Sequence, residues 1–484
     1  MLTGVKFQAH PTDELRLILS QWMGCQRAIW NAKVQEDVYY RGLCRKFFPK
    51  EYAYGLHDQS YSQYKDKELT PWFYDVPSQI LRNGAVRWYQ TFINFLRGVC
   101  GRPRFHAKKD KASVYITSEL FRFVKHPKSD ETCIELGTKS KPIGLLKFRA
   151  HRDYEFPRSI TVSKRRGRWS VSFNYTDPLI DDNALLSLEQ QLEQLRTLDE
   201  EDLGKLTLGM DRGVSITCAT NDKGLGNDGN FSYSDKQLKR FKHLQTKLKR
   251  LQRRLSRQVK GSNRYNKTKF RLSKVHEQIA NTRIEFAHQT SRKIVDSDNQ
   301  VFVLEDLKTK NMTKRPKPKR CEKTGKFLYN GASKKAGLNK AILHAGWYRI
   351  GLFVTYKAAK LNKAVFKVPA HHTSQECASC GHTHPDNRQT QGKFVCRSCG
   401  RAENADTNAA KVIAKRAIKL IKDTGTVLDG NLLTTEAALA KKGKRRKSSS
   451  AKPSTGRSKE HGGDIRRLEP CESRNPEGKD TLCQ

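Results

Sequence analysis

Apolar positions recur at helical spacing in two parts of the first hundred residues. Between residues 14 and 34 they stand three to five apart, which predicts a helix with one apolar face. A second helix is predicted from Ser78, directly after Pro77, to Gly98, which ends the pattern. A short strand is expected ahead of both, at 4–8. The N-terminal region therefore begins as a strand followed by helices.

Alternating apolar and polar positions then predict strands. The clearest segments are 114–117, 145–148, 160–163 and 169–175, and a basic hairpin loop at 164–168 joins the last two. Residues 176–204 are acidic and rich in leucine, which is typical of a helical linker. This part of the chain is interpreted as a β-rich module with a cationic edge.

The C-terminal half alternates apolar strands with helices, the pattern of an α/β fold. The stretch 308–340 is basic and poor in apolar residues, so a loop is expected there, and the polar segment after Lys422 is expected to be largely disordered. The predicted elements are strands at 206–219, 301–307 and 363–368, an antiparallel helical hairpin at 236–294, and helices at 340–361 and 404–421.

The charge balance narrows the possible partners. The 484 residues include 93 Lys and Arg against 49 Asp and Glu, a formal net charge of +44, which favours a polyanionic partner. No run of 18 apolar residues and no secretory pattern at the N-terminus is present, so we expect a cytoplasmic protein that binds nucleic acid and no membrane.

One segment concentrates this charge. Residues 236–274 hold 16 Lys and Arg and no acidic residue. A solvated helix face normally mixes both signs, so a face of one sign requires an external anion, and phosphate is the expected one. Arg250, Arg253 and Arg254 on this segment are the predicted nucleic-acid contacts.

Four of the twelve cysteines form two CxxC pairs, Cys377 with Cys380 and Cys396 with Cys399. This is the spacing at which two tight turns present four thiolates to one tetrahedral Zn²⁺. A disulfide is disfavoured in the cytosol. Because four thiolates leave no open position for a reactant, the predicted zinc is structural.

Three carboxylates lie beside apolar core segments: Asp211 in a first strand, Glu305 at the end of a later strand, and Asp406 in the first turn of the last helix. Phosphodiester hydrolysis by two metal ions needs a cluster of hard oxygen ligands that holds two Mg²⁺. Spacing alone is weak support in a chain with 49 acidic residues, and the surrounding motifs strengthen it.

These motifs and their order resemble the TnpB proteins of insertion sequences, over about 420 residues. The N-terminal half shares Arg27 and Trp30 in the opening helix, the turn at 101–105 and the hairpin at 160–173. The C-terminal motifs are Gly209-Met-Asp211-Arg-Gly213, Leu304-Glu305-Asp306-Leu307 with Asn311-Met312, the two CxxC pairs each followed by glycine, and Asp406-Thr-Asn408-Ala-Ala410.

The resemblance implies an RNA-guided DNA endonuclease of a transposable element. Its fold would be a RuvC-like (RNase H-like) nuclease domain with an inserted zinc ribbon, preceded by a β-barrel-like wedge domain with an inserted helical recognition domain. The implied partners are guide RNA and double-stranded target DNA. Asp211, Glu305 and Asp406 would bind two catalytic Mg²⁺, and the four cysteines would bind Zn²⁺.

The domain boundaries follow from combining pattern and resemblance. They are a wedge strand at 1–12, helical recognition at 13–98, wedge β domain and linker at 99–204, RuvC-like nuclease at 205–370, zinc ribbon at 371–403, the final nuclease helix at 404–423 and a basic tail at 424–484.

Several alternatives share parts of this pattern. A compact type V CRISPR effector is hardly separable by sequence, and a nuclease-dead RNA-guided DNA-binding protein would have lost triad carboxylates, all of which are present. A transposase is disfavoured because no tyrosine or serine recombinase site is apparent. A basic zinc-ribbon RNA-binding protein would leave the three carboxylate motifs without a role. The host, a prokaryote by resemblance, and the oligomeric state stay open.

Overall fold

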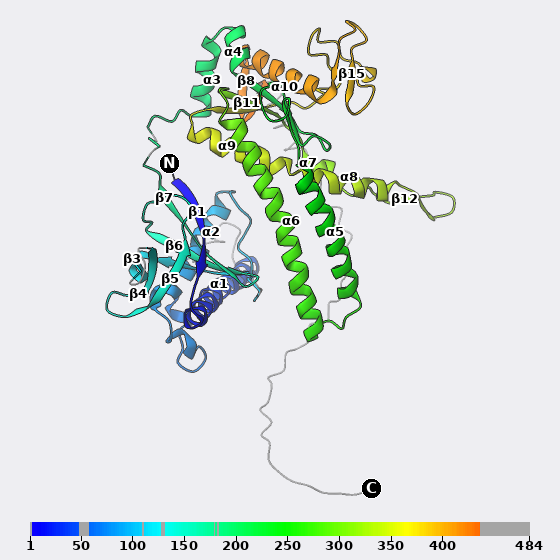
Figure 1. The fold of residues 1–484 in the computed structure, drawn as a ribbon. Helices are drawn as coiled ribbons and strands as arrows, with labels where there is room; N and C mark the ends of the chain where they lie inside the picture. Colours follow the sequence, from blue (N-terminus) through cyan, green and yellow to red (C-terminus); the bar gives the residue numbers. More distant parts are fainter. Residues whose placement is uncertain are drawn as a thin grey trace.

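The computed structural model describes residues 2–47, 58–108, 111–126, 131–178, 180–181 and 183–435. Within these ranges the chain forms two seven-stranded sheets, one in each half, and a long helical hairpin that projects from the second (Figure 1). None of the described helices is long and apolar enough to cross a membrane.

The first sheet is antiparallel, in the order β2-β6-β7-β1-β5-β4-β3. Every second residue of β1 is buried, as expected for a strand with one face on a core. The predicted strands are confirmed with longer bounds, whereas β3 and β4 were not predicted. The strands are β1 (Leu2–His10), β2 (Lys111–Thr117), β3 (Phe121–Lys125), β4 (Thr132–Gly137), β5 (Pro142–Arg149), β6 (Ser159–Arg165) and β7 (Arg168–Thr176).

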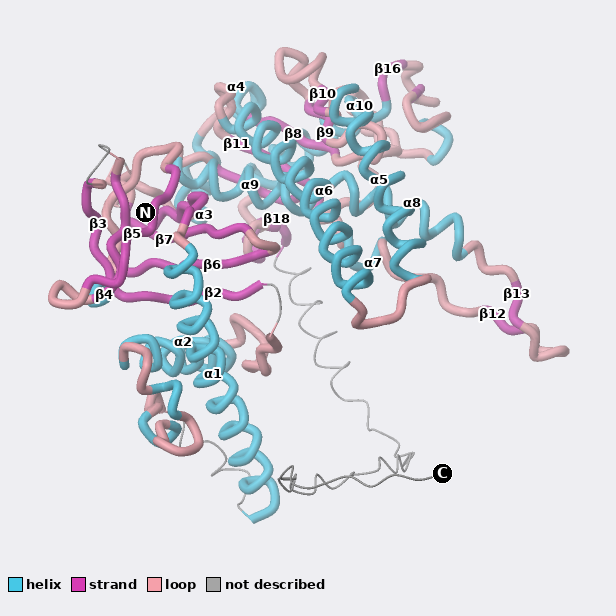
Figure 2. Tube along the Cα trace, turned by 60° about the horizontal axis from the view of Figure 1, so that its bottom comes forward, coloured by secondary structure: helices cyan, strands magenta, loops and turns pink. Residues whose placement is uncertain are grey.

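Two helices, α1 (Asp13–Phe47) and α2 (Ser78–Leu96), pack together and against this sheet, as Figure 2 shows. Trp22 of α1 and Ile80 of α2 are fully buried in the same core as Phe7 of β1. Both predicted helices are present, and α1 is longer than expected. The apolar spacing of 14–34 therefore marks the buried part of a helix whose end is more exposed.

The second sheet is mixed, in the order β10-β9-β8-β11-β14-β18-β17. β8, β11, β14 and β18 are parallel neighbours, and β9, β10 and β17 run antiparallel to the strands they pair with. The strands are β8 (Thr207–Asp211), β9 (Cys218–Thr220), β10 (Asn230–Phe231), β11 (Val301–Glu305), β14 (Ala364–Val368), β17 (Thr426–Asp429) and β18 (Leu432–Thr435).

Helices cover both faces of this sheet, which confirms the α/β class. On one face, α6 (Asn263–Val295) and α9 (Trp347–Lys360) share a core with Leu208 and Phe302. On the other, α3 (Leu188–Thr197), α4 (Glu200–Leu206) and α10 (Ala405–Lys422) pack over Val303 and Phe366. Strands β8 and β11 are thus buried on both sides, as their continuous apolar runs require.

The hairpin of α5 (Asp235–Ser256) and α6 is confirmed. The two helices lie side by side in both views (Figures 1 and 2). Ser234 and Ser262 cap their N-termini by accepting backbone N–H groups. A small core of Phe241, Leu244, Val275 and Ile279 joins the helices at the end near the sheet.

The region 308–361 differs from the prediction of a loop and one long helix. It contains α7 (Thr309–Met312), a two-stranded hairpin of β12 (Lys319–Arg320) and β13 (Phe327–Leu328), and α8 (Ala332–Ala345) before α9. Gly346 separates α8 from α9, with φ 74°, a left-handed conformation that ends one helix before the next begins. The apolar periodicity of 340–361 continues across that break, so it did not reveal the bend.

The tail prediction was wrong for its first residues. β17 and β18 lie within the segment expected to be disordered, and β18 pairs with β14 through Lys367 and Leu432. Leu433 of β18 is fully buried in the core beneath α10. Residues 436–484, the rest of the predicted tail, lie outside the described residues.

Candidate active site and metal centre

The strand register brings two of the predicted carboxylates together. β8 and β11 are parallel, and Leu304 is aligned with Met210, so Glu305 and Asp211 end neighbouring strands at the same edge of the sheet. Aligned residues of parallel strands place their side chains on the same face. Both carboxyl groups therefore point toward the face that α10 covers.

Helix α10 supplies the third carboxylate. The side chain of Asn404 caps the helix by accepting the backbone N–H groups of Asp406 and Thr407. Further along, the helix lies so close to β8 that a Cβ on Gly209 would collide with the carbonyl oxygen of Ala410. Gly209 therefore permits the close packing that places the first turn of α10, with Asp406, beside the ends of β8 and β11.

The three carboxyl groups interact electrostatically. Burial, and then the charges of Glu305 and Asp406, raise the pKa of Asp211 to about 7. Burial also raises the pKa of Glu305, against a hydrogen bond from Thr373, and that of Asp406, against the charge of Arg388. Burial is the main cause at all three carboxyl groups, and the charges of the other two add to it at Asp211.

Three polar neighbours of the cluster were not predicted as site residues. Nη2 of Arg388 lies 3.0 Å from Oδ1 of Asp406, Thr373 donates a hydrogen bond to Oε1 of Glu305, and Arg212 donates one to the backbone carbonyl of Glu305. Arg388 and Thr373 belong to the cysteine-rich segment. The adjacency of Thr373 and Arg388 to the CxxC pairs was a usable signal, but only the fold reveals what they contact.

The donor set suits a hard divalent cation. All three groups offer carboxylate oxygens, the ligands that Mg²⁺ prefers, and a bound cation would offset both the burial and the neighbouring charges that raise the pKa of Asp211. Among the described residues these three groups do not form a cluster as tight as the cysteines, and a single arginine, Arg388, pairs with Asp406. The residues fit a magnesium site.

The four predicted cysteines do form a tight cluster. Their sulfur atoms all lie within 4.8 Å of one another, with 3.7 Å between Cys377 and Cys399 and 3.6 Å between Cys380 and Cys396. Each CxxC pair is followed by a glycine with a left-handed backbone, with φ 74° at the first and 71° at the second. The set matches a structural metal site of the zinc type.

The cysteine cluster is tied directly to the carboxylates. The buried side-chain amide of Asn408 in α10 accepts the N–H of Ala378, at 2.9 Å, and donates to the carbonyl of Glu376, at 2.7 Å. A two-stranded ribbon, β15 (Lys393–Val395) with β16 (Ala402–Asn404), then leads directly into α10. The cysteine ribbon therefore positions the start of the helix that carries Asp406.

The predicted nucleic-acid contacts lie on α5. Arg250, Arg253 and Arg254 are all exposed, and none of them forms an ion pair with another described residue. Their positions on the outer part of the hairpin, beyond its small apolar core, leave the guanidinium groups accessible to solvent.

Three family models match this chain. "Probable transposase" (OrfB_IS605) covers residues 187–316, which include Asp211 and Glu305, "Helix-turn-helix domain" (HTH_OrfB_IS605) covers 1–42, and "Cas12f1-like, TNB domain" covers 347–413, which include the four cysteines and Asp406. The chain is also 28% identical over 415 residues to a protein of Escherichia coli K12 named "Putative RNA-guided DNA endonuclease InsQ", covering 85% of this chain and 91% of the relative.

These matches support the resemblance to the TnpB family.

A second relative, from Streptomyces pristinaespiralis, is named "Putative RNA-guided DNA endonuclease" and is 25% identical over 416 residues, 84% of this chain and 87% of the relative. Among solved structures, the Cas12f1-sgRNA-target DNA complex matches with a TM-score of 0.48 and 14% identity, over 83% of each chain.

Proposed function

We propose that this chain is an RNA-guided DNA endonuclease of a transposable element, which cleaves guide-matched double-stranded DNA by metal-dependent phosphodiester hydrolysis. The observation that carries the proposal is the convergence of Asp211, Glu305 and Asp406 from β8, β11 and α10 on one edge of the second sheet. The relatives from Escherichia coli and Streptomyces pristinaespiralis are both named as putative RNA-guided DNA endonucleases, and this chain matches each of them over most of its length.

The order of the second sheet supports a RuvC-like assignment of the nuclease domain. Three antiparallel strands, β8, β9 and β10, continue into the parallel strands β11 and β14, and the acidic residues stand at the carboxyl ends of β8 and β11. Ligand sites of open α/β sheets lie at this edge.

The carboxylates are the proposed metal ligands. Two Mg²⁺ held there would activate water and stabilise the leaving oxygen of the cut strand. The hydrogen bond from Thr373 fixes one oxygen of Glu305, and Arg388 pairs with Asp406. Glu305 and Asp406 are buried and Asp211 is half-buried, and reduced solvation strengthens the attraction of a carboxylate for a cation.

The remaining charge suits nucleic-acid partners. We propose guide RNA and target DNA as the ligands of the basic face with Arg250, Arg253 and Arg254, so that base pairing reads the sequence and the protein holds the backbones. In this proposal residues 1–12 and 99–204 form the wedge, and residues 13–98 form the recognition region. Zinc bound by the four cysteines would hold the ribbon against α10.

The decisive experiment expresses the protein with its flanking DNA, sequences the RNA that co-purifies, and offers a duplex that matches this RNA. We expect Mg²⁺-dependent cleavage that Asp211→Ala, Glu305→Ala and Asp406→Ala each reduce by at least about a thousandfold, while binding of RNA and duplex persists.

The matched control is Glu403→Ala. Glu403 lies three residues before Asp406, but its Oε2 pairs with Lys411 at 2.6 Å, so the variant should cut at a rate close to that of the wild type. Binding of the matched duplex without cleavage, across a range of Mg²⁺ concentrations and flanking sequences, would instead support a nuclease-dead DNA-binding protein.

A further inference from the structure

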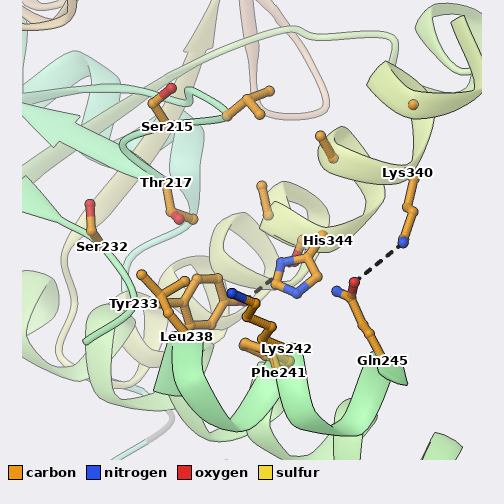
Figure 3. Close-up of a pocket in the computed structure, with 14 residues that line it drawn as sticks. Ser215, Thr217, Ser232, Tyr233, Leu238, Phe241, Lys242, Gln245, Lys340 and His344 are labelled. Atoms are coloured by element: carbon orange, nitrogen blue, oxygen red, sulfur yellow. Dashed lines mark hydrogen bonds between the residues drawn. The ribbon is translucent and has the colours of Figure 1, made fainter. Parts of the chain in front are cut away.

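A cavity of about 430 Å³ lies beside the carboxylate cluster, between the loop after β8, the start of α5 and helix α8 (Figure 3). None of the carboxylates or cysteines lines it. Its volume falls in the range of small-molecule sites, which combine an apolar lining with a few polar groups.

One loop separates the cavity from the carboxylates. A Cβ on Gly213 would lie 3.7 Å from Oδ2 of Asp406, so this residue borders the cluster. Nε1 of Trp347 donates a hydrogen bond of 2.8 Å to the carbonyl of Gly213 and holds the loop in place. The next residues, Val214 and Ser215, line the cavity. The loop 213–215 therefore borders the carboxylates at one end and the cavity at the other.

Aromatic rings form the base of the cavity. Phe241 meets Tyr233 and His344 edge to face, with ring centroids 5.1 and 4.4 Å apart. The Tyr233 hydroxyl donates to the carbonyl of His344 at 3.3 Å, which links α8 to the start of α5. Burial, and then the charges of Arg283 and Lys340, lower the pKa of His344 to about 4, so its ring is neutral at pH 7. The base is therefore rigid, aromatic and uncharged.

The rim carries cations on one side and hydroxyl groups on the other. Lys242 and Lys340 stand opposite Ser215 and Ser232 in Figure 3. Neither lysine forms an ion pair within the described ranges of the chain. Among the described residues, Nζ of Lys340 donates one hydrogen bond, to Oε1 of Gln245 at a long 3.4 Å, so an anion could recruit it at little cost.

We propose that this cavity binds one nucleotide of the DNA strand that is cut, with the base against the aromatic rings and a phosphate at Lys242 and Lys340. This inference rests on the proposed function. A nucleotide combines a flat apolar base with an anion, the same pairing of surfaces that the cavity offers. Its position beside the carboxylates makes it a site that fixes the strand for cleavage.

The first test needs no cleavage. The full-length protein in Mg²⁺-free buffer is mixed with oligothymidine that carries one 5-iododeoxyuridine, irradiated, and digested for mass spectrometry. We expect crosslinks on peptides that contain Tyr233, Phe241 or His344. Crosslinks confined to other parts of the chain would overturn the proposal, whether or not the protein cuts DNA.

Two substitutions on α8 provide a matched pair. Ala341 lines the cavity, so Ala341→Trp fills it, whereas Leu343 is exposed on the same helix and Leu343→Trp adds the same bulk outside. Ala341→Trp should remove at least nine-tenths of the crosslink, and Leu343→Trp should retain it. Lys242→Gln leaves the cavity shape nearly unchanged and should also weaken the crosslink. This variant tests the proposal if Ala341→Trp fails to fold.

A free nucleotide is the other source of the same chemistry. If micromolar thymidine monophosphate protects the cavity from crosslinking, a free mononucleotide is the ligand and the strand proposal is wrong.

In the cutting reaction, one abasic position in the target should slow the wild type about tenfold, as expected for one lost base contact. Ala341→Trp should be slow on intact DNA and lose nothing further at that position; an abasic scan without any such position would contradict the proposal.

Discussion

The cysteine cluster and the carboxylate cluster adjoin each other, but they are built in opposite ways. Four sulfur atoms from two nearby turns lie within 4.8 Å of one another, while the carboxylates come from three elements spread over the C-terminal half and form no comparably tight group among the described residues. Local turns make the first cluster, and the sheet and α10 make the second. One is assembled by neighbouring residues, and the other by the fold.

Charge sharpens this contrast. Thiolates gathered in one place contribute to folding when they share a metal. The carboxylates are gathered at a cost, because burial and mutual repulsion raise the pKa of Asp211 to about 7. The cysteine cluster should therefore stabilise the fold, and the carboxylate cluster should destabilise it until a cation binds.

The largest expected effect is the loss of one thiol. Cys380→Ser should lower the bound metal from about one zinc per chain and destabilise the ribbon by several kcal/mol, since structural zinc contributes on the order of 10 kcal/mol to small zinc domains. Metal analysis and thermal unfolding measure both quantities. Unchanged stoichiometric zinc in Cys380→Ser would refute the assignment. Cys100→Ser, at an exposed cysteine outside the cluster, is the control.

The basic surface of α5 belongs to neither cluster, so substitutions there test whether nucleic-acid binding is separate from both clusters. Replacing Arg250, Arg253 and Arg254 by alanine should weaken nucleic-acid binding similarly across sequences, because these exposed groups are proposed to contact phosphates. The slope of log affinity against log salt should become shallower by about 3, one for each lost contact. Zinc content and unfolding temperature should not change. Full affinity with an unchanged slope would place the nucleic acid elsewhere.

The sequence predicted most of the elements whose apolar residues lie in a core from one end of the element to the other. Strands β8 and β11 and the helices α2 and α10 are examples, because burial on one or both faces fixes the residue types. The break at Gly346 was missed because the helical spacing of apolar residues continues from α8 into α9. The hairpin of β17 and β18 was missed because it is short and its neighbours are polar.

The candidate site divides in the same way. The ligand types stand out in the sequence because two CxxC pairs, or a lone acid in an apolar strand, rarely serve packing alone. Arg388 and Thr373 lie close to the CxxC pairs in the sequence, but only the packing of the ribbon on α10 brings them to the carboxylates. The role of Asn408 likewise depends on the backbone groups that it meets.

Neutralising a carboxylate should stabilise the fold, whereas Cys380→Ser should destabilise it, and the effect on stability should be smaller. In Mg²⁺-free buffer with zinc retained, Asp211→Asn should stabilise the protein by on the order of 2 kcal/mol at pH 8. The folded-state pKa of Asp211 is raised to about 7, so between about pH 4 and 7 the folded protein holds a proton that the unfolded chain has lost, and at pH 8 the ionised carboxylate destabilises the fold. Stability of the wild type should therefore fall as the pH rises from about 4 through 7.

Thermal unfolding at a series of pH values measures this dependence, which Asp211→Asn should reduce. Asp296→Asn, at an exposed surface ion pair with Arg292, is the control and should not stabilise the protein. If Asp211→Asn destabilises the Mg²⁺-free protein as Cys380→Ser does, the two clusters are alike and the contrast is wrong.

The smallest expected effect concerns Arg388, the ribbon residue that joins the two clusters. Its guanidinium lies 3.0 Å from Asp406 and lowers the pKa of that carboxyl against the effect of burial, so it competes with a cation for the same negative charge. Removing one positive charge near the site is worth roughly 1 kcal/mol in a solvated setting, about fivefold in affinity. At pH 8, Arg388→Gln should therefore lower the half-saturating Mg²⁺ concentration about fivefold, as measured by thermal shift during a Mg²⁺ titration.

Arg397→Gln is the matched control, because Arg397 lies in the same ribbon and pairs with Asp386, at 2.8 Å. A higher half-saturating concentration in Arg388→Gln would mean that the arginine holds Asp406 in place for the metal, and that the ribbon helps to build the carboxylate cluster rather than opposing its charge.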